Sequence, residues 1–135
     1  MGHGLTCIFG CALISDESTE TFKWLFTTFL TAMGGKPPIS IMTDQDGAMR
    51  SAIAQVFKDA VHRNCVFHIK NKAELKAGRC FDSKENLRKQ FNDIIDNSLT
   101  ITEFEKDWKA MIEGRGIQHI KYFQDIYNTR ERWVP

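Results

Sequence analysis

The acidic turn Thr43-Asp44-Gln45-Asp46 is the first candidate for chemistry, because it follows a short apolar stretch and precedes a helical pattern. In α/β proteins, catalytic and ligand-binding groups gather beyond the carboxyl ends of strands. A carboxylate there can hold a divalent ion of the Mg²⁺ type, as phosphoryl transfer requires. In the structural alternative, Asp46 caps the next helix and Asp44 makes a turn. Spacing alone favours this alternative.

The segment His62-Arg63-Asn64-Cys65-Val66-Phe67-His68 is the second candidate. Cys65 and His68 can share one zinc ion if a turn or helix begins there. Structural zinc takes four ligands, so His62 is a candidate third donor and Cys80 a fourth, although no spacing rule supports Cys80. A buried cysteine beside a hydrogen-bonded histidine is the alternative, and local sequence favours it.

The acidic segment that begins at Thr102 is the third candidate. Thr102 and Glu105 have the spacing of a capping box, which predicts that Glu105 stabilises a helix N-terminus. Glu105 also flanks the apolar pair Phe104 and Trp108, at the expected edge of the core. Local sequence therefore favours capping over catalysis for Glu105.

Basic residues are enriched in one segment: Lys70, Lys72, Lys76, Arg79, Lys84, Arg88 and Lys89. A helical segment of this kind can contact a phosphate backbone. A solvated helix face is the favoured alternative. The whole chain has 18 basic and 17 acidic residues, a net charge of +1, so it is not as a whole an electrostatic clamp for nucleic acid or an anionic membrane.

The first two candidate segments lie in a part of the chain whose sequence has an α/β pattern. The almost continuously apolar run Leu5–Ile14 predicts a strand buried on both faces of a sheet. A helix follows from Thr19 or Glu20 and ends at Gly34-Gly35. Residues 39–42 predict a second strand, Asp46 begins a second helix, and 60–67 predict a third strand. This alternation favours a sheet with helices packed on it.

The second half of the chain is predicted to be helical, over about 69–76, 83–97, 102–113 and 117–130, with breaks at Gly78, Asn97-Ser98 and Gly114-Arg115-Gly116. We expect a single domain, 1–135, with an α/β part over 1–68 and a helical part over 69–135. The three tryptophans, Trp24, Trp108 and Trp133, are expected at or near the core.

Composition narrows the class of protein. No apolar run approaches the roughly 20 residues that a membrane helix needs, and the N-terminus lacks the features of a signal peptide. The four cysteines are too sparse for a disulfide scaffold, and Cys7 and Cys11 are expected as buried small hydrophobes. A reducing compartment, cytosol or nucleus, is therefore expected.

Several motifs, taken together, resemble the transposase domain of plant Mutator-like elements (MULE), and more closely the FAR-RED IMPAIRED RESPONSE / FAR-RED ELONGATED HYPOCOTYL family. The resemblance covers essentially the whole chain, in order. The motifs are LTCIFGCALI at 5–14, DESTETFKWLF at 16–26, GGKPP at 34–38, TDQDGAM at 43–49, HRNCVFHI at 62–69, EFE at 103–105 with Trp108, and RERWVP at 130–135.

The resemblance implies an RNase H-like fold, a mixed sheet flanked by helices with a helical insertion. Active transposases of this type use two aspartates and a glutamate to hold two divalent metals for DNA cleavage and strand transfer. The second family aspartate corresponds to Asp44, and the glutamate to Glu105, with Glu103 as its rival. The family's Cys-x-x-His corresponds to Cys65 and His68, which keeps zinc as a candidate cofactor at these two residues.

The first family aspartate lies on a strand upstream of this chain's start, so we expect the first two strands and that ligand to be absent. Asp44 and Glu105 are then vestigial, with Mg²⁺ or Mn²⁺ relevant only to a catalytic version. The family's N-terminal zinc module and its SWIM zinc finger are also outside the chain. We therefore expect Met1 to mark a truncated gene model or a degenerate copy.

The expected function is a transposase-derived transcription regulator, or a fragment of one, in the nucleus and without nuclease activity. DNA and protein partners would bind through modules outside this chain, with a homo- or heterodimer as the expected assembly and no membrane partner. One alternative is the partial catalytic core of a Mutator-like transposase. The other is a non-functional remnant that cannot fold alone, because Leu5–Ile14 lacks sheet partners.

Overall fold

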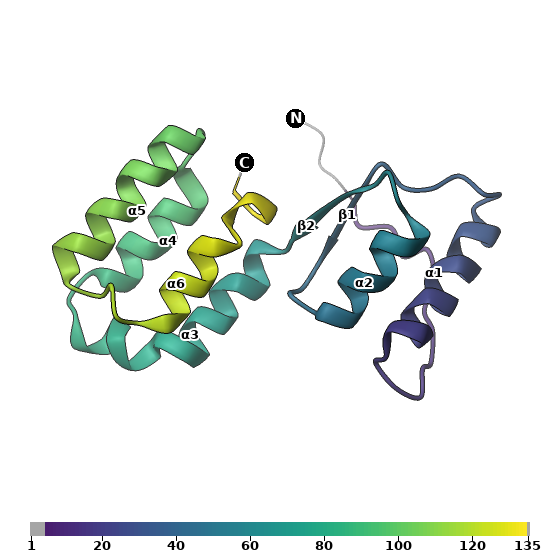
Figure 1. Cartoon of the computed structure of the whole chain (residues 1–135), viewed down its shortest axis with the longest axis horizontal. Helices are drawn as coiled ribbons and strands as arrows, with labels where there is room; N and C mark the ends of the chain where they lie inside the picture. Colours follow the sequence, from purple (N-terminus) through teal and green to yellow (C-terminus); the bar gives the residue numbers. More distant parts are fainter. Residues whose placement is uncertain (1–4, 135) are drawn as a thin grey trace. The chain divides into compact units, whose positions relative to one another are not determined.

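The computed structural model describes residues 5–134, which form a mixed α/β structure that is mostly helical (Figure 1). The described elements are α1 Thr19–Ala32, β1 Ser40–Thr43, α2 Gly47–Val56, β2 Val61–Asn64, α3 Val66–Ser83, α4 Leu87–Asn97, α5 Ile101–Arg115, α6 Lys121–Asn128 and the 3₁₀ turn η1 Arg130–Arg132. The described residues cluster into two compact units. The first contains those up to Ile39 together with Asp46–Ala60, and the second contains Ser40–Gln45 and the residues from Val61 onward.

The first unit is built on the packing of α1 against α2. Ser18 caps α1 by accepting a hydrogen bond from the Thr21 N–H at 3.2 Å. The helix ends before Gly34 and Gly35, whose φ values of +67° and +76° favour glycine. The buried apolar side chains of this unit are Phe22, Ala52, Ile53 and Phe57.

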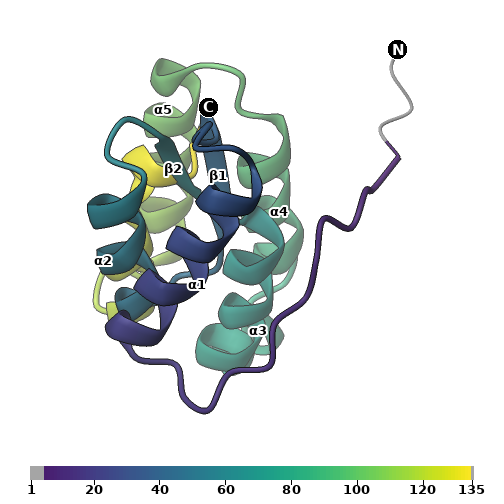
Figure 2. The ribbon, with the colours of Figure 1, turned by 90° about the vertical axis from the view of Figure 1, so that its right-hand side faces the viewer.

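The prediction of a buried strand over Leu5–Ile14 is wrong. These residues form neither helix nor strand (Figure 2), and Leu5 and Leu13 are 93% and 100% exposed. A strand buried on both faces needs neighbours that pair with its edges, whereas the sheet within residues 5–134 contains only β1 and β2, paired with each other. The apolar composition of the segment indicated a buried strand, but a strand is buried only where neighbouring strands pair with it.

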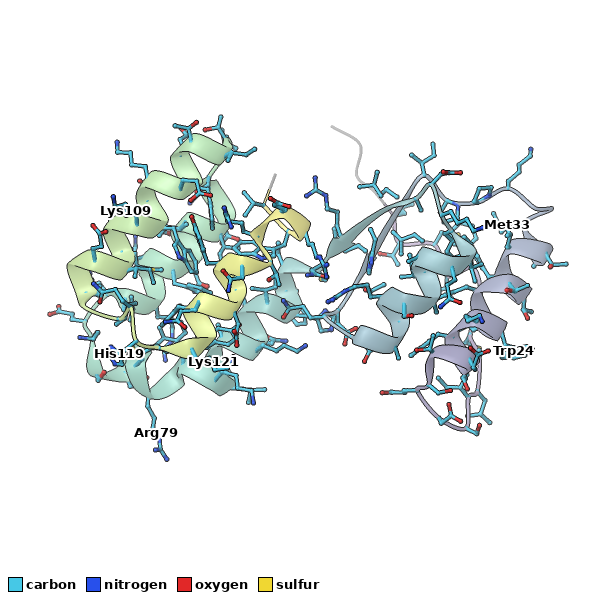
Figure 3. All side chains as sticks on the ribbon, viewed as in Figure 1. Trp24, Met33, Arg79, Lys109, His119 and Lys121 are labelled. Atoms are coloured by element: carbon cyan, nitrogen blue, oxygen red, sulfur yellow. The ribbon has the colours of Figure 1, made fainter. Side chains whose placement is uncertain are left out.

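The burial expected for three nearby side chains is also wrong. Cys7 and Cys11 are exposed because the segment that carries them packs into no core. Trp24 is 57% exposed on α1 (Figure 3), whereas Phe22 is the buried residue of that helix.

The second unit begins with β1 and β2, which pair in parallel from Ser40↔Val61 to Thr43↔Asn64. Parallel pairing brings the carboxyl ends of both strands to the same edge. The strand predicted over 60–67 ends early, at Asn64, because α3 begins at Val66.

Helices α3 to α6 form the rest of this unit, with α4 against both α3 and α5, and α6 against α3. Gly78 does not break α3, which continues to Ser83. The face formed by Ala73, Ala77 and Phe81 is buried along its length. Helix α6 is shorter than predicted, since Ile120 is its N-cap residue and Thr129 its C-cap residue.

An aromatic and aliphatic core fills the space between these helices. The inward residues predicted for α4 (Leu87, Phe91, Ile94 and Ile95) are all buried, which confirms the helical periodicity. Trp108 and Trp133 are buried as predicted and lie edge to face, with ring centroids 6.5 Å apart. Among the helices described, none is both long enough and apolar enough to cross a membrane.

Candidate functional site

The carboxyl ends of β1 and β2 place Asp44 directly after the paired residues Thr43 and Asn64. Asp44 is half-buried, and its Oδ1 has no hydrogen-bond partner within residues 5–134. Asp46 has the predicted structural role, because its Oδ1 accepts a hydrogen bond from the Met49 N–H at 2.6 Å and caps α2. Of the two acidic residues in the turn, Asp44 is therefore the one that capping does not occupy.

The Cys-x-x-His motif lies at the start of α3. Cys65 is the N-cap residue and donates its backbone N–H to the Thr43 carbonyl at 2.7 Å, while His68 is exposed in the first turn. His62 lies on β2, where its Nε2 and the Thr43 Oγ1 form a hydrogen bond of 2.8 Å. The motif is thus attached to β1 by main-chain and side-chain hydrogen bonds.

The described donors do not make up a structural zinc site. Cys80 lies on the same continuous helix as Cys65, and a rise of 1.5 Å per residue separates them by about 20 Å, far beyond two zinc–sulfur bonds. The suggestion of Cys80 as a fourth ligand is therefore wrong. Within residues 5–134, no group of three or more His, Cys, Asp or Glu side chains is gathered for a metal. Zinc at Cys65 and His68 stays a prediction.

Glu105 does not cap α5, so the capping prediction is wrong. Helix α5 begins at Ile101, and its N-cap is Thr100, which accepts a hydrogen bond from the Glu103 N–H at 3.2 Å. Glu103 in turn accepts a hydrogen bond from the N–H of Leu99, the residue before the N-cap, at 3.1 Å, in a variant of the capping box. The box lies two residues earlier than predicted because the helix starts earlier, which leaves Glu105 on the side of the helix.

Glu105 instead contacts the C-terminal part of the chain. Its carboxylate accepts a hydrogen bond from the Tyr127 hydroxyl and one from the Arg130 Nε at 2.5 Å. The Arg130 guanidinium carbon lies 4.0 Å from the centre of the Tyr127 ring, and Arg130 Nη1 donates to the Tyr127 carbonyl at 3.0 Å. We call Glu105, Tyr127 and Arg130 the α5–α6 clamp. Sequence reasoning missed Tyr127 and Arg130, because only the fold brings them to α5.

The electrostatics of the clamp favour an ionised Glu105. The hydrogen bond from Tyr127 lowers the pKa of Glu105 most. Burial raises this pKa, and Arg130 lowers it by its hydrogen bond and its charge, so that the pKa stays below its ordinary value. The same hydrogen bond raises the pKa of Tyr127, which therefore stays a hydrogen-bond donor. Both carboxylate oxygens of Glu105 are engaged in these contacts.

The basic segment contains two kinds of cation. Some are paired: Lys70 with Asp96 at 2.5 Å, Arg88 with Glu74 at 2.9 Å and Asp82 at 2.8 Å, and Lys89 with Asp93 at 2.7 Å. Others form no ion pair with any described residue: Lys72, Lys76, Arg79 and Lys84. The solvated-face interpretation therefore suits only part of the segment.

Comparison with protein families gives a match to the MULE transposase domain over residues 2–72, more than half of the chain. The chain belongs to the MULE transposase domain family. The match includes Asp44, Cys65 and His68 and ends within α3, so Glu105 lies outside it.

Curated relatives extend this MULE relationship over nearly the whole chain. Protein FAR1-RELATED SEQUENCE 5 of Arabidopsis thaliana is 36% identical over 98% of the chain, and Protein FAR-RED IMPAIRED RESPONSE 1 of the same plant is 35% identical over 98%. The resemblance to the FAR-RED IMPAIRED RESPONSE family is thus confirmed. The chain spans 17% and 16% of the length of these two relatives. No solved structure matches it.

Proposed function

We propose that this chain is the transposase-derived portion of a transcription regulator, that it acts in DNA-linked regulation through protein contacts, and that it has no nuclease activity. The observation that carries this proposal is the alignment of 98% of the chain with Protein FAR1-RELATED SEQUENCE 5 at 36% identity. The α5–α6 clamp supports the absence of nuclease activity, because Glu105 already uses both oxygens within the fold.

The finer fold that we propose is RNase H-like. In its support, β1, α2 and β2 follow one another as a parallel strand–helix–strand unit, and the carboxyl end of β1 carries Asp44.

Catalytic chemistry of the family type would need converging carboxylates that hold two divalent ions. Within residues 5–134, Asp44 is a carboxylate at a strand end, whereas Glu105 is occupied by Tyr127 and Arg130 and Glu103 by the cap of α5. The described carboxylates therefore do not fit a two-metal set, and we assign no metal-dependent step to this chain.

A nicking assay tests the catalytic part of the proposal. The purified chain is incubated with supercoiled plasmid DNA and Mg²⁺ or Mn²⁺, beside an Asp44→Asn variant as the matched control. We expect equal, background conversion to the nicked form with both proteins. Metal-dependent nicking by the wild-type chain that disappears in Asp44→Asn would instead support a transposase core.

A reporter assay tests the regulatory part. The chain is fused to an unrelated DNA-binding domain, and transcription from a promoter that carries the matching sites is measured in plant cells. We expect the fusion to change transcription and to be found in the nucleus. Transcription equal to that with the DNA-binding domain alone would contradict a regulatory role through protein contacts.

A further inference from the structure

The unpaired cations of α3 lie on one face of the helix. Lys72, Lys76 and Arg79 follow one another at spacings of four and three residues, which places them on successive turns of the same side. We call these three residues the α3 cationic row. Lys76 and Arg79 are exposed and Lys72 is half-buried, and Figure 3 shows Arg79 projecting away from the helix.

The two sides of α3 differ in whether their charged side chains form ion pairs. On the flank that faces α4, Lys70 pairs with Asp96, and Glu74 accepts a hydrogen bond from Arg88. The row, by contrast, forms no ion pair within residues 5–134, and its one polar side-chain contact in that range is a hydrogen bond of 3.4 Å from Lys72 Nζ to the Gln45 carbonyl. A carbonyl neutralises no charge, so the row keeps its three positive charges.

Two members of the row also line a groove. Lys72 and Lys76 from α3 and Lys121 from α6 line it, and its volume is about 660 Å³. The one carboxylate in its lining is Asp125, which is paired with Lys121 at 2.9 Å. The groove therefore keeps two uncompensated cations, and Arg79 continues the row one turn beyond them.

We propose that the α3 cationic row binds the phosphate backbone of duplex DNA without reading its sequence. The row spans about 10 Å along the helix, the length over which one strand of a duplex presents about three phosphates. Lysine ammonium groups on flexible stems bind phosphate oxygens as point charges and need no fixed geometry. This contact belongs to the chain itself and so goes beyond the proposed regulation through protein contacts.

An acidic protein is the competing partner. Protein interfaces draw most of their affinity from aromatic and other well-packed anchors at their centre. Tyr122, the aromatic residue in the lining of the groove, has its hydroxyl bonded to the Ile69 carbonyl at 2.9 Å and is half-buried. A row of cations without a free aromatic anchor suits a phosphate backbone better.

Fluorescence anisotropy with a labelled DNA duplex of arbitrary sequence tests the proposal. The test variant replaces Lys72, Lys76 and Arg79 with Gln, and the control variant replaces three exposed lysines elsewhere, Lys58, Lys106 and Lys109, with Gln, so that both lose the same net charge. We expect the row variant to bind on the order of 10- to 100-fold more weakly at low salt, and the slope of log affinity against log salt to fall by about 2 to 3. The control variant should stay close to wild type.

The double variant Lys76→Gln/Arg79→Gln checks that folding is not the cause, since both side chains are exposed and should lose about one unit of slope each. Wild-type helix content by circular dichroism is required of every variant. An equal loss in the row and control variants would overturn the proposal, as would wild-type protein that binds no duplex. Tighter binding of single-stranded RNA, or of polyglutamate in place of DNA, would also overturn it in favour of that partner class.

Discussion

The two compact units differ in how much of their apolar side-chain surface they bury. The helices α3 to α6 bury a continuous cluster that includes Phe91, Phe104, Trp108 and Phe123. The unit of α1 and α2 buries only Phe22, Ala52, Ile53 and Phe57, while Trp24 and most of the apolar side chains of residues 5–14 face solvent. Apolar residues thus stabilise a unit only where the topology supplies a facing surface, and the helical unit should dominate the stability of the chain.

Paired tryptophan substitutions give the largest effect that this difference predicts. Trp108 is 4% exposed and contacts several aromatic rings, so Trp108→Ala should lower the free energy of unfolding by about 3 to 5 kcal/mol. Trp24→Ala removes an exposed ring and should change it by less than about 0.5 kcal/mol. Urea unfolding followed by far-UV circular dichroism measures both. Comparable losses in the two variants would show that Trp24 packs in a core that the structure does not contain.

The α5–α6 clamp should give the next largest effect. Glu105→Gln removes the charge that Arg130 and Tyr127 contact, and should cost about 1 to 2 kcal/mol in free energy of unfolding. Glu103→Gln is the matched control on the same helix, since glutamine can still complete a capping box. A larger loss in Glu103→Gln than in Glu105→Gln would contradict the assignment of the two roles.

The clamp also predicts a pH dependence. Folding lowers the pKa of Glu105, so the clamp's contribution is present above the carboxyl group's ordinary pKa and is lost as the pH falls through the lowered value. The stability difference between wild type and Glu105→Gln should therefore be largest at neutral pH and should shrink in acid. A difference that stays constant from neutral to acidic pH would show that Glu105 acts through packing and not through its charge.

The cap of α5 should give the smallest effect. Thr100→Ala removes the hydroxyl that accepts from the Glu103 N–H, and should cost about 1 kcal/mol. Thr102→Ala, inside the helix, is the control and should be neutral or slightly stabilising because alanine favours helices. A larger loss of stability in Thr102→Ala than in Thr100→Ala, measured by urea unfolding, would show that the helix begins at the position predicted from sequence.

Local signals predicted the elements near the candidate site well. Asp46 caps α2 as expected, and the apolar spacing of Leu87, Phe91, Ile94 and Ile95 identified the buried face of α4. These predictions succeeded because a cap or a helix face depends on residues within one or two turns. Gly78 shows the limit of such rules, because the buried face of α3 outweighs the roughly 1 kcal/mol that a glycine costs in a helix.

The predictions for the candidate site likewise succeeded where they depended on neighbouring residues and failed where they depended on distant ones. The sequence placed Asp44 after a strand and Cys65 and His68 at a helix start, and the structure has them there. It could not foresee that Glu105 meets Tyr127 and Arg130, because these residues lie 22 and 25 positions away and are joined only by the packing of the helices. Nor could it separate the paired from the unpaired cations of the basic segment.

The sequence by itself determined the family, the order of the elements after Ser18, most helix faces and the acidic turn between β1 and α2, because motif, periodicity and capping are local properties. The tertiary structure alone decided that Leu5–Ile14 is largely exposed, that Glu105 is a clamp residue, and that Lys72, Lys76 and Arg79 have no acidic ion-pair partner within residues 5–134. Burial and charge neutralisation depend on which surface lies opposite a side chain, and that surface comes from distant parts of the chain.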